Sequence, residues 1–242
     1  MAAIPVVDLA PYSLSVPVQE VDPKALQELG DELCKAFTTF GFVYLKNHGI
    51  PQNIVEEVFT TSKTFFEKPV DVKQEYARPA DSNQGWVSLE REKLNPERPA
   101  ADLKEAYNMT VVDDQHLLPV DIIPNFYDVF KSLFTSAQEL GNRILDLMSI
   151  GLNIDRSFLR DCHKNVGKKV NQTTLRSLYY PRISKGMIIQ HHCLPISIGT
   201  IIQPLSTVIK RYDNPTTLYS DIKRYGNSSS LYNVLKSNII LH

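Results

Sequence analysis

The chain has 242 residues, 43% of them hydrophobic, and a formal net charge of −1 at pH 7. This composition can build a sizeable core, so we exclude disorder along the whole chain, and the near-zero charge gives no electrostatic reason to expect nucleic-acid binding. No run of eighteen apolar residues occurs and the first residues do not resemble a signal peptide, so we expect a cytoplasmic protein that does not cross a membrane.

The first fifty residues predict a strand, a helix and a second strand. Residues 4–9 are apolar and predict a short strand. Asp22 stands before a proline, which is typical of a helix start, and apolar residues at helical spacing predict a helix over 23–40 that a glycine ends. Residues 42–46 are β-branched and aromatic and predict a strand, and the sequence Asn-His-Gly at 47–49 predicts a turn.

The middle of the chain predicts further helices and strands around one long irregular loop. The strongest signal is an apolar face at helical spacing over 125–150, which predicts the longest helix. In chain order we expect a helix over 51–66, the irregular loop over 78–101, a strand over 102–109, the long helix, a short helix over 156–163 and a strand over 174–180.

The composition changes abruptly after Pro181. Residues 1–181 carry more acidic than basic side chains, whereas residues 182–242 carry seven Lys and Arg against two Asp and no Glu. Short strands are expected at 187–190 and 196–202, and no regular structure is expected beyond Lys210. The change indicates that the last segment has a different character from the rest, and an alternative exon, a read-through or a frameshift would each produce it.

Six short motifs occur in an order that resembles a known family. They are IPVVDL, GFVYLKNHGIP, FFEKP, QGW, DLKEAYNM and LRSLYYP, at residues 4–9, 41–51, 65–69, 84–86, 102–109 and 175–181. Together they are similar to the N-terminal half of the isopenicillin N synthase-like enzymes, which are non-haem iron(II), 2-oxoglutarate-dependent dioxygenases. The resemblance implies Fe(II) and 2-oxoglutarate as cofactors, and oxidation of a small-molecule substrate coupled to decarboxylation of 2-oxoglutarate.

The resemblance also implies an α+β fold. In the family a helix–strand region precedes a double-stranded β-helix, or jelly roll, and a long helix braces this barrel. We therefore expect a dioxygenase N-terminal domain over 1–120, bracing helices and the first barrel strand over 121–181, and a divergent tail over 182–242 that replaces most of the barrel. A jelly roll needs about 83 residues at ordinary strand and loop lengths, so the barrel is expected to be incomplete.

The residues that hold iron in the family are not found at the matching positions. The family uses a His-x-Asp pair and a distal histidine, the facial triad of non-haem iron enzymes. Here Pro195 falls on the first histidine position and Ser197 on the aspartate position. The sequence 182–184 reads Arg-x-Ser, the family's 2-oxoglutarate motif, but it precedes the expected site. We therefore predict no catalytic and no metal-binding residues, and an inactive, truncated or variant family member.

Three residues remain candidates for ligand binding through the resemblance. Tyr180 matches a position near 2-oxoglutarate and is the candidate cosubstrate contact, although a buried core role is the alternative. Trp86 lies in a loop where the family contacts substrate, and it is equally a candidate packing anchor. Arg176 is a candidate substrate residue that would line the cavity or pair with an acidic group, and the sequence does not choose between these two roles.

The histidines and cysteines favour structural interpretations. His48 is expected to hydrogen-bond the backbone of its turn, and His116 and His163 are expected to be solvated. Cys34, Cys162 and Cys193 fit neither a disulfide framework nor a zinc site. The pair His191-His192 has no carboxylate two residues on, so a site that combines it with Asp213 would need a rearranged fold of the tail, and substitution of His192 would then abolish metal binding.

A second function from a different class stays open. The chain is alternatively a non-catalytic binding or regulatory module that associates with a full-length paralogue. The surface expected to mediate this association is the apolar face of helix 125–150, left uncovered if the barrel is incomplete.

Overall fold

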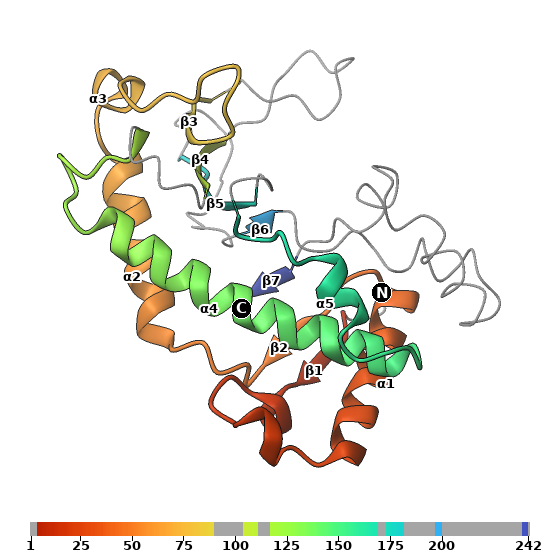
Figure 1. The fold of residues 1–242 in the computed structure, drawn as a ribbon. Coiled ribbons are helices and arrows are strands. Elements are labelled where there is room, and N and C mark those ends of the chain that lie inside the picture. The colour runs from red at the N-terminus through yellow and green to blue at the C-terminus, as the bar shows by residue number, and fades with distance from the viewer. Residues whose placement is uncertain are drawn as a thin grey trace. The chain divides into compact units, whose positions relative to one another are not determined.

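The computed structural model describes residues 4–89, 104–110, 117–168 and 173–181, together with two further short strands. The chain forms two compact units whose segments alternate along the sequence (Figure 1). Unit 1 contains residues 1–50, 135–166 and 198–242, and unit 2 contains residues 51–134 and 167–197. The domain boundaries expected at 120 and 181 stay a prediction.

Unit 1 contains a parallel arrangement of three short strands. β1 (Val6–Asp8) pairs in parallel with β2 (Tyr44–Lys46), which confirms the first two predicted strands. β7 (Ile239–Leu241) pairs in parallel with the other side of β2 and was not predicted. Its three residues follow a long polar stretch. An apolar run of three residues is too short to predict a strand by itself.

Helix α1 (Pro23–Thr39) begins and ends where the sequence predicts. The Asp22 carboxylate accepts a hydrogen bond from the backbone N–H of Lys24 at 3.2 Å, so it caps the helix start. Gly41 has a φ of 78° and its N–H donates to the carbonyl of Phe37 at 3.0 Å. This left-handed glycine lets the chain leave the helix and enter β2. Two short 3₁₀ helices, η1 (Ala10–Tyr12) and η2 (Val18–Glu20), lie between β1 and α1.

Helix α4 (Phe126–Gly151) confirms the predicted long helix to within one residue, and α5 (Phe158–Cys162) follows it. The apolar face of α4 is buried, contrary to the expectation that it is uncovered. Buried residues on this face are Phe126, Val129, Phe130, Leu133, Phe134, Ala137, Leu140, Ile144, Leu147 and Met148. The proposed docking surface on this helix is therefore not available.

Unit 2 combines two helices with an antiparallel sheet. Helix α2 (Gln52–Phe66) was predicted, and the short α3 (Val70–Gln74) was not. The sheet has the order β3 (Gly85–Val87), β4 (Glu105–Thr110) and β5 (Thr174–Tyr179).

β3 lies inside the stretch 78–101 that was expected to be irregular throughout, so that expectation is wrong for these three residues. The backbone N–H of Trp86 donates to the carbonyl of Tyr76 at 2.7 Å, which ties the strand to the end of α3 as well as to β4. Three residues amid polar and proline-rich sequence give no alternation long enough to detect.

The β3–β4–β5 sheet has two chemically different faces, because side chains alternate along each strand. One face packs on helices: the Tyr107 ring lies 5.1 Å from Phe65 of α2 and 4.9 Å from Phe126 at the start of α4. The opposite face, which we call the Asn108 face, carries seven side chains placed there by strand register: Val87, Ala106, Asn108, Thr110, Thr174, Arg176 and Leu178.

Strand β6 (Ser197–Gly199) lies within the predicted strand 196–202, whereas the predicted strand 187–190 lies outside the described residues. The fold is a mixture of helices and small sheets, as expected for the α+β class. The jelly roll stays a prediction. Of the helices that the structure describes, none is long and apolar enough to cross a bilayer.

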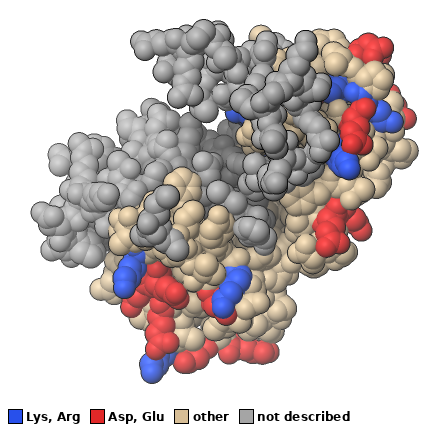
Figure 2. All heavy atoms as spheres, turned by 180° about the vertical axis from the view of Figure 1, so that it is seen from behind, with Lys and Arg blue, Asp and Glu red and all other residues tan. Residues whose placement is uncertain are grey.

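Charged side chains of the described surface form mixed groups in which acidic residues adjoin basic ones (Figure 2). Exposed ion pairs illustrate this: Lys24 and Glu28 lie 3.7 Å apart, and Lys46 and Asp8 lie 3.1 Å apart. The expectation from net charge that the chain does not bind nucleic acid stays a prediction.

Candidate functional site

All three candidate ligand residues lie on or beside the sheet of unit 2. Trp86 is on β3, Arg176 is on β5, and Tyr180 directly follows β5. Arg176 lies opposite Asn108 in the antiparallel register. β4 thus lies between β3 and β5, with Trp86 on one neighbouring strand and Arg176 on the other.

Trp86 lies on the helix-packed face rather than on the Asn108 face. Its side chain is 2% exposed, and its indole Nε1 donates to Oε2 of Glu105 at 2.7 Å. The same carboxylate oxygen lies 2.7 Å from Nζ of Lys73, which also donates to the carbonyl of Phe66 at 2.9 Å. The Lys73 ammonium lies 5.3 Å from the centre of the Trp86 ring. These contacts support the packing-anchor interpretation of Trp86, and its substrate role stays a prediction.

The buried ion pair explains how a charged lysine lies inside unit 2. Lys73 is 3% exposed and Glu105 is 5% exposed. A buried charge is tolerated when an opposite charge and further hydrogen bonds replace its water shell. Lys73 has two acceptors and Glu105 has two donors, so the group is satisfied internally. Sequence alone did not single out this pair, because Lys73 stands among polar residues of a short helix.

The side chains of Tyr179 and Tyr180, at the end of β5, lie on opposite faces of the sheet. The ring of Tyr179 stacks on that of Phe66 at 5.2 Å with an interplanar angle of 7°, so it belongs to the helix-packed face. Alternation then places Tyr180 on the same side as Arg176 and Leu178. Tyr180 and Arg176 are both half-buried, and their ligand roles stay predictions.

Asn108 is the residue of this region that sequence reasoning missed. Its side chain is 4% exposed, and Oδ1 accepts no hydrogen bond from any residue that the structure describes. The neighbouring Thr110 hydroxyl donates to Oε1 of Gln84 at 2.7 Å and is therefore already engaged. The motif DLKEAYNM contained the signal, since alternation separates Asn108 from the packed Tyr107 once a strand is assumed.

Two buried or hydrogen-bonded tyrosines of unit 2, Tyr76 and Tyr107, have raised pKa values. Burial raises the pKa of Tyr107, whose hydroxyl donates to the carbonyl of Leu117 at 2.6 Å. Burial also raises the pKa of Tyr76, and its hydrogen bond to Asp121, 2.6 Å away, adds to the rise. Neither phenol is thus available as a base near neutral pH.

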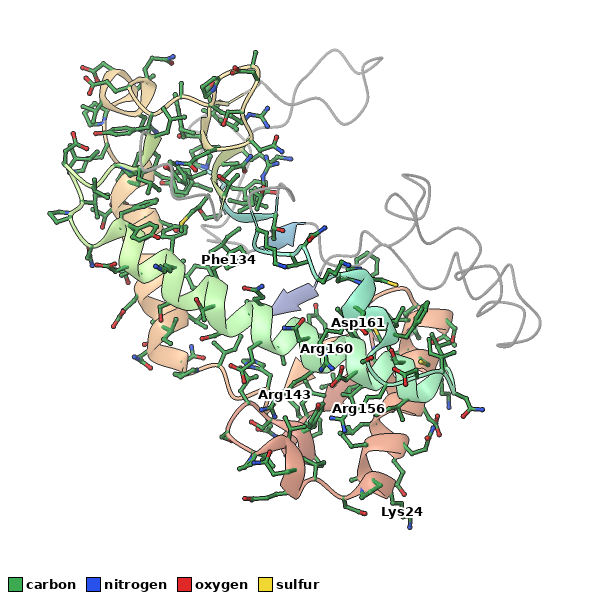
Figure 3. The ribbon with its side chains drawn as sticks, in the orientation of Figure 1. Lys24, Phe134, Arg143, Arg156, Arg160 and Asp161 are labelled. Atoms are coloured by element: carbon green, nitrogen blue, oxygen red, sulfur yellow. The ribbon has the colours of Figure 1, made fainter. Side chains whose placement is uncertain are left out.

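Unit 1 contains a group of charged side chains around the buried Asp146. The buried Asp146 carboxylate accepts from Arg160 at 3.0 Å, from Arg156 at 3.3 Å and from the Tyr12 hydroxyl at 3.3 Å. Arg143 lies with its guanidinium carbon 5.0 Å from the Tyr12 ring centre and donates to the backbone carbonyls of Tyr12 and Val16. Figure 3 labels Arg143 on α4, Arg156 before α5 and Arg160 on α5. The hydrogen bond from Tyr12 to Asp146 fixes the tyrosine against α4.

The described histidines are in structural positions. The Nδ1 atom of His48 accepts from the N–H of Ile50 at 3.1 Å, which confirms the expected backbone contact in the turn. The expectation that His163 is solvated is wrong. Its Nδ1 atom lies 2.6 Å from the carbonyl oxygen of Leu159, and burial lowers the pKa of the imidazole. His116, the pair at 191–192 and Asp213 lie outside the described residues.

Residues that fit Fe(II) are not found in the part of the chain that the structure describes. No three His, Cys, Asp or Glu side chains there lie close enough to hold a metal ion. In the sequence as a whole, none of the six histidines is followed two residues later by Asp or Glu. The family's iron ligands are therefore not matched, and no catalytic role is derived from the metal or from 2-oxoglutarate.

Comparison with known proteins identifies the family. The model described as the N-terminal region of non-haem dioxygenases in morphine synthesis matches residues 4–127, about half of the chain. The chain belongs to the non-haem Fe(II)/2-oxoglutarate-dependent dioxygenase family, and the matching part is the N-terminal region.

Individual relatives agree with this assignment. A 2-oxoglutarate-dependent dioxygenase, frbA from Dothideomycetidae sp., is 28% identical over 149 residues, which are 55% of this chain and 44% of the relative. A full-length protein from Neurospora crassa, solved with alpha-KG and with alpha-KG plus thymine, is 26% identical with a TM-score of 0.57, over 74% of this chain. A 2OG-Fe(II) oxygenase family protein from Caulobacter crescentus shares the fold, with a TM-score of 0.62 at 21% identity over 84% of this chain and 63% of its own.

The chain spans about half the length of two of these relatives, namely 44% of frbA and 51% of the Neurospora crassa protein in its complex with alpha-KG. The family model matches residues 4–127 of the chain. Activity, substrate and partners of this chain are therefore matters for proposal.

Proposed function

We propose that this chain is a variant member of the Fe(II)/2-oxoglutarate-dependent oxygenase family that keeps the N-terminal scaffold and the β3–β4–β5 sheet but does not itself carry out the family reaction. The parent reaction is oxidation of a small molecule coupled to decarboxylation of 2-oxoglutarate. The truncation expected from the sequence and a cytoplasmic location stay predictions.

One observation carries the proposal: the sequence has no His-x-Asp or His-x-Glu pair at any position. The facial triad needs two histidines and one carboxylate on one side of the iron, and the family supplies two of these three ligands from that pair. At the matching positions stand Pro195, which has no donor atom, and Ser197, whose neutral hydroxyl is a poor ligand for Fe(II). Without these ligands the metal has no fixed place, so 2-oxoglutarate has nothing to chelate.

The packing of the scaffold supports a folded protein rather than a damaged one. The apolar face of α4 is buried, and the described charged groups at Lys73–Glu105 and around Asp146 are paired. Burial of that face removes the surface that association with a full-length paralogue was expected to use, so no observation favours the binding-module alternative.

The proposal is tested by anaerobic titration of the purified chain, first with Fe(II) and then with 2-oxoglutarate, while the visible absorption is followed. We expect no charge-transfer band of the iron–2-oxoglutarate chelate, together with the circular dichroism of a folded α+β protein. A band at stoichiometric iron would overturn the proposal and would point to His191, His192 and His242 as ligands.

The variant His192→Ala serves as the comparison in the same titration. If the tail builds a rearranged site, the parent chain shows a band and this variant loses it. If the proposal holds, the two proteins give identical spectra at every step of the titration.

A further inference from the structure

Two arginine side chains at the surface of unit 1 share one buried carboxylate. Asp146 of α4 is 3% exposed, and its Oδ2 accepts from Nη1 of Arg160 at 3.0 Å and from Nε of Arg156 at 3.3 Å. The side chains of Arg156 and Arg160 are 38% and 43% exposed. Because both donors contact the same oxygen atom, the two guanidinium groups lie next to each other and remain accessible from solvent.

This arrangement leaves a positive charge without a partner. One carboxylate cannot neutralise two guanidinium groups, and a guanidinium does not lose its proton in a protein. The neighbouring acidic residues do not supply the missing charge: Asp155 and Asp161 each lie 2.9 Å from the Ser157 hydroxyl. In the part of the chain that the structure describes, neither of them forms an ion pair with either arginine.

The two arginines also keep N–H groups that no described residue uses. Arg160 donates from Nη1 alone, which leaves Nε and Nη2 side by side on one edge of its guanidinium. Such an edge binds two oxygens of one anion at once. Arg156 donates from Nε to Asp146 and from Nη2 to the Tyr12 hydroxyl at 2.6 Å, which leaves Nη1. Tyr12 is 1% exposed, so buried partners hold Arg156 in place.

We infer that Arg156 and Arg160 form a binding site for the phosphate group of a small phosphorylated molecule. The Nε–Nη2 edge of Arg160 donates to two phosphate oxygens, and Nη1 of Arg156 donates to the third. A phosphate monoester has three acceptor oxygens and a charge of about −1.5 to −2 at pH 7, whereas a carboxylate has two oxygens and one charge. This site goes beyond the proposed function and requires neither Fe(II) nor 2-oxoglutarate.

Phenyl phosphate and phenyl sulfate form a matched pair of probes, because they share the ring and the tetrahedral group and differ in charge. Binding of each to the purified chain is measured by calorimetry at about pH 7.5 and low ionic strength. We expect phenyl phosphate to bind about fivefold more tightly, as one further unit charge at about 4 Å in water predicts. Equal affinities, or no binding of either probe, would overturn the inference. Tighter binding of inorganic phosphate than of phenyl phosphate would overturn the assignment to an ester.

The variant Arg160→Gln separates a built site from general attraction of anions. We expect its affinity for phenyl phosphate to fall about tenfold, because the variant loses a charge-assisted, bidentate contact. Lys24→Gln is the matched control, since it removes the same charge from an exposed position of α1 in the same unit. It should change the affinity by less than twofold. Equal losses in the two variants would show that only net charge matters and would overturn the inference.

The NMR signals of the arginine Nε–Hε groups report the contact directly in the parent chain, so they decide the question even if the variant folds poorly. We expect phenyl phosphate to shift the Nε–Hε signal of Arg160, with the same saturation as in calorimetry. If the ester binds and this signal does not move, the ester lies elsewhere and the inference is wrong. Since these titrations omit Fe(II) and 2-oxoglutarate, their outcome leaves the proposed loss of iron binding untouched.

Discussion

Gly30 of α1 and Gly151 of α4 are in direct backbone contact, so these two helices cross with no side chain between them. A Cβ atom on Gly30 would lie 2.6 Å from the carbonyl oxygen of Leu147 and 2.8 Å from the backbone nitrogen of Gly151. A Cβ atom on Gly151 would lie 2.8 Å from Sγ of Cys34. Glycine is needed at this crossing for space, because backbone atoms cannot move aside as a flexible side chain can.

Replacement of Gly30 by alanine should therefore destabilise the protein, although alanine favours helices. Overpacking of a tight contact costs about 1–3 kcal/mol, and the gain in helix propensity returns at most about 1 kcal/mol. We expect Gly30→Ala to lower the free energy of unfolding by about 1–2 kcal/mol in urea titrations. Glu28→Ala, at an exposed position of the same helix, should change it by less than about 0.5 kcal/mol. A Gly30→Ala protein as stable as its parent would refute the close crossing.

The buried ion pair between Lys73 and Glu105 should be far more sensitive to loss of one partner than to loss of both. Lys73→Met leaves the Glu105 carboxylate buried with only the Trp86 N–H as donor, and an uncompensated buried charge costs about 3–5 kcal/mol. In the double variant Lys73→Met/Glu105→Leu no charge is left unpaired. We expect its unfolding free energy to lie well above the value that the two single variants predict by addition.

The exposed pair of Lys63 and Glu67 on α2 provides the control for that cycle. Its atoms lie 3.8 Å apart in solvent, where such i,i+4 pairs contribute about 0.3–0.5 kcal/mol. Lys63→Met should therefore change the unfolding free energy only slightly. Additive costs in the Lys73–Glu105 cycle would show that the two side chains do not interact.

Local signals were sufficient to predict the elements with long apolar periods or clear end residues. The helix α1, bounded by Asp22 and Gly41, and the long helix α4 were predicted almost to the residue. β1 and β2 also have only three residues, but they lie within the longer predicted runs 4–9 and 42–46. The strands β3 and β7 were missed because no such run surrounds them, and their pairing partners, β4 and β2, are distant in sequence. Such strands are defined by the sheet that they join, and periodicity does not reveal it.

The sequence named Trp86 and Arg176 as candidates but not the direction of their side chains. It could not say that Trp86 turns toward Glu105 on the helix-packed face. That direction depends on strand register, which a one-residue shift would reverse. Asn108 was overlooked for the same reason, since its burial without a partner is visible only once β4 lies between β3 and β5.

The thiols of Cys34 and Cys162 should differ strongly in reactivity. Cys34 is buried next to the α4 backbone, and burial, then Asp31, raises the pKa of its thiol to about 12. Cys162 is exposed at the end of α5. We expect N-ethylmaleimide to modify Cys162 in native protein within minutes and to modify Cys34 only when urea is added, as followed by peptide mass spectrometry. Labelling of both thiols at equal rates without denaturant would show that the helix crossing opens in the native state.

Stability should fall as the pH is lowered below about 6.5, and His163 should account for part of that fall. Burial lowers the pKa of His163 in the folded protein, and its hydrogen bond to the Leu159 carbonyl opposes this only in part. An unfolded chain has a histidine pKa of about 6.5, so below that pH the unfolded state binds more protons than the folded state. The contribution of His163 is thus fully present above the unfolded pKa and is lost as the pH falls toward the lower folded value.

The variant His163→Asn keeps a side-chain N–H donor for the Leu159 carbonyl but does not titrate. We expect its unfolding free energy to fall less steeply between pH 7 and pH 5 than that of the parent chain, measured by urea titration at several pH values. Some slope should remain, because burial also lowers the pKa of His48. Lys164→Asn, at the next and exposed position, should retain the full parental slope. If His163→Asn retained it too, His163 would be accessible to water and protonated equally in both states.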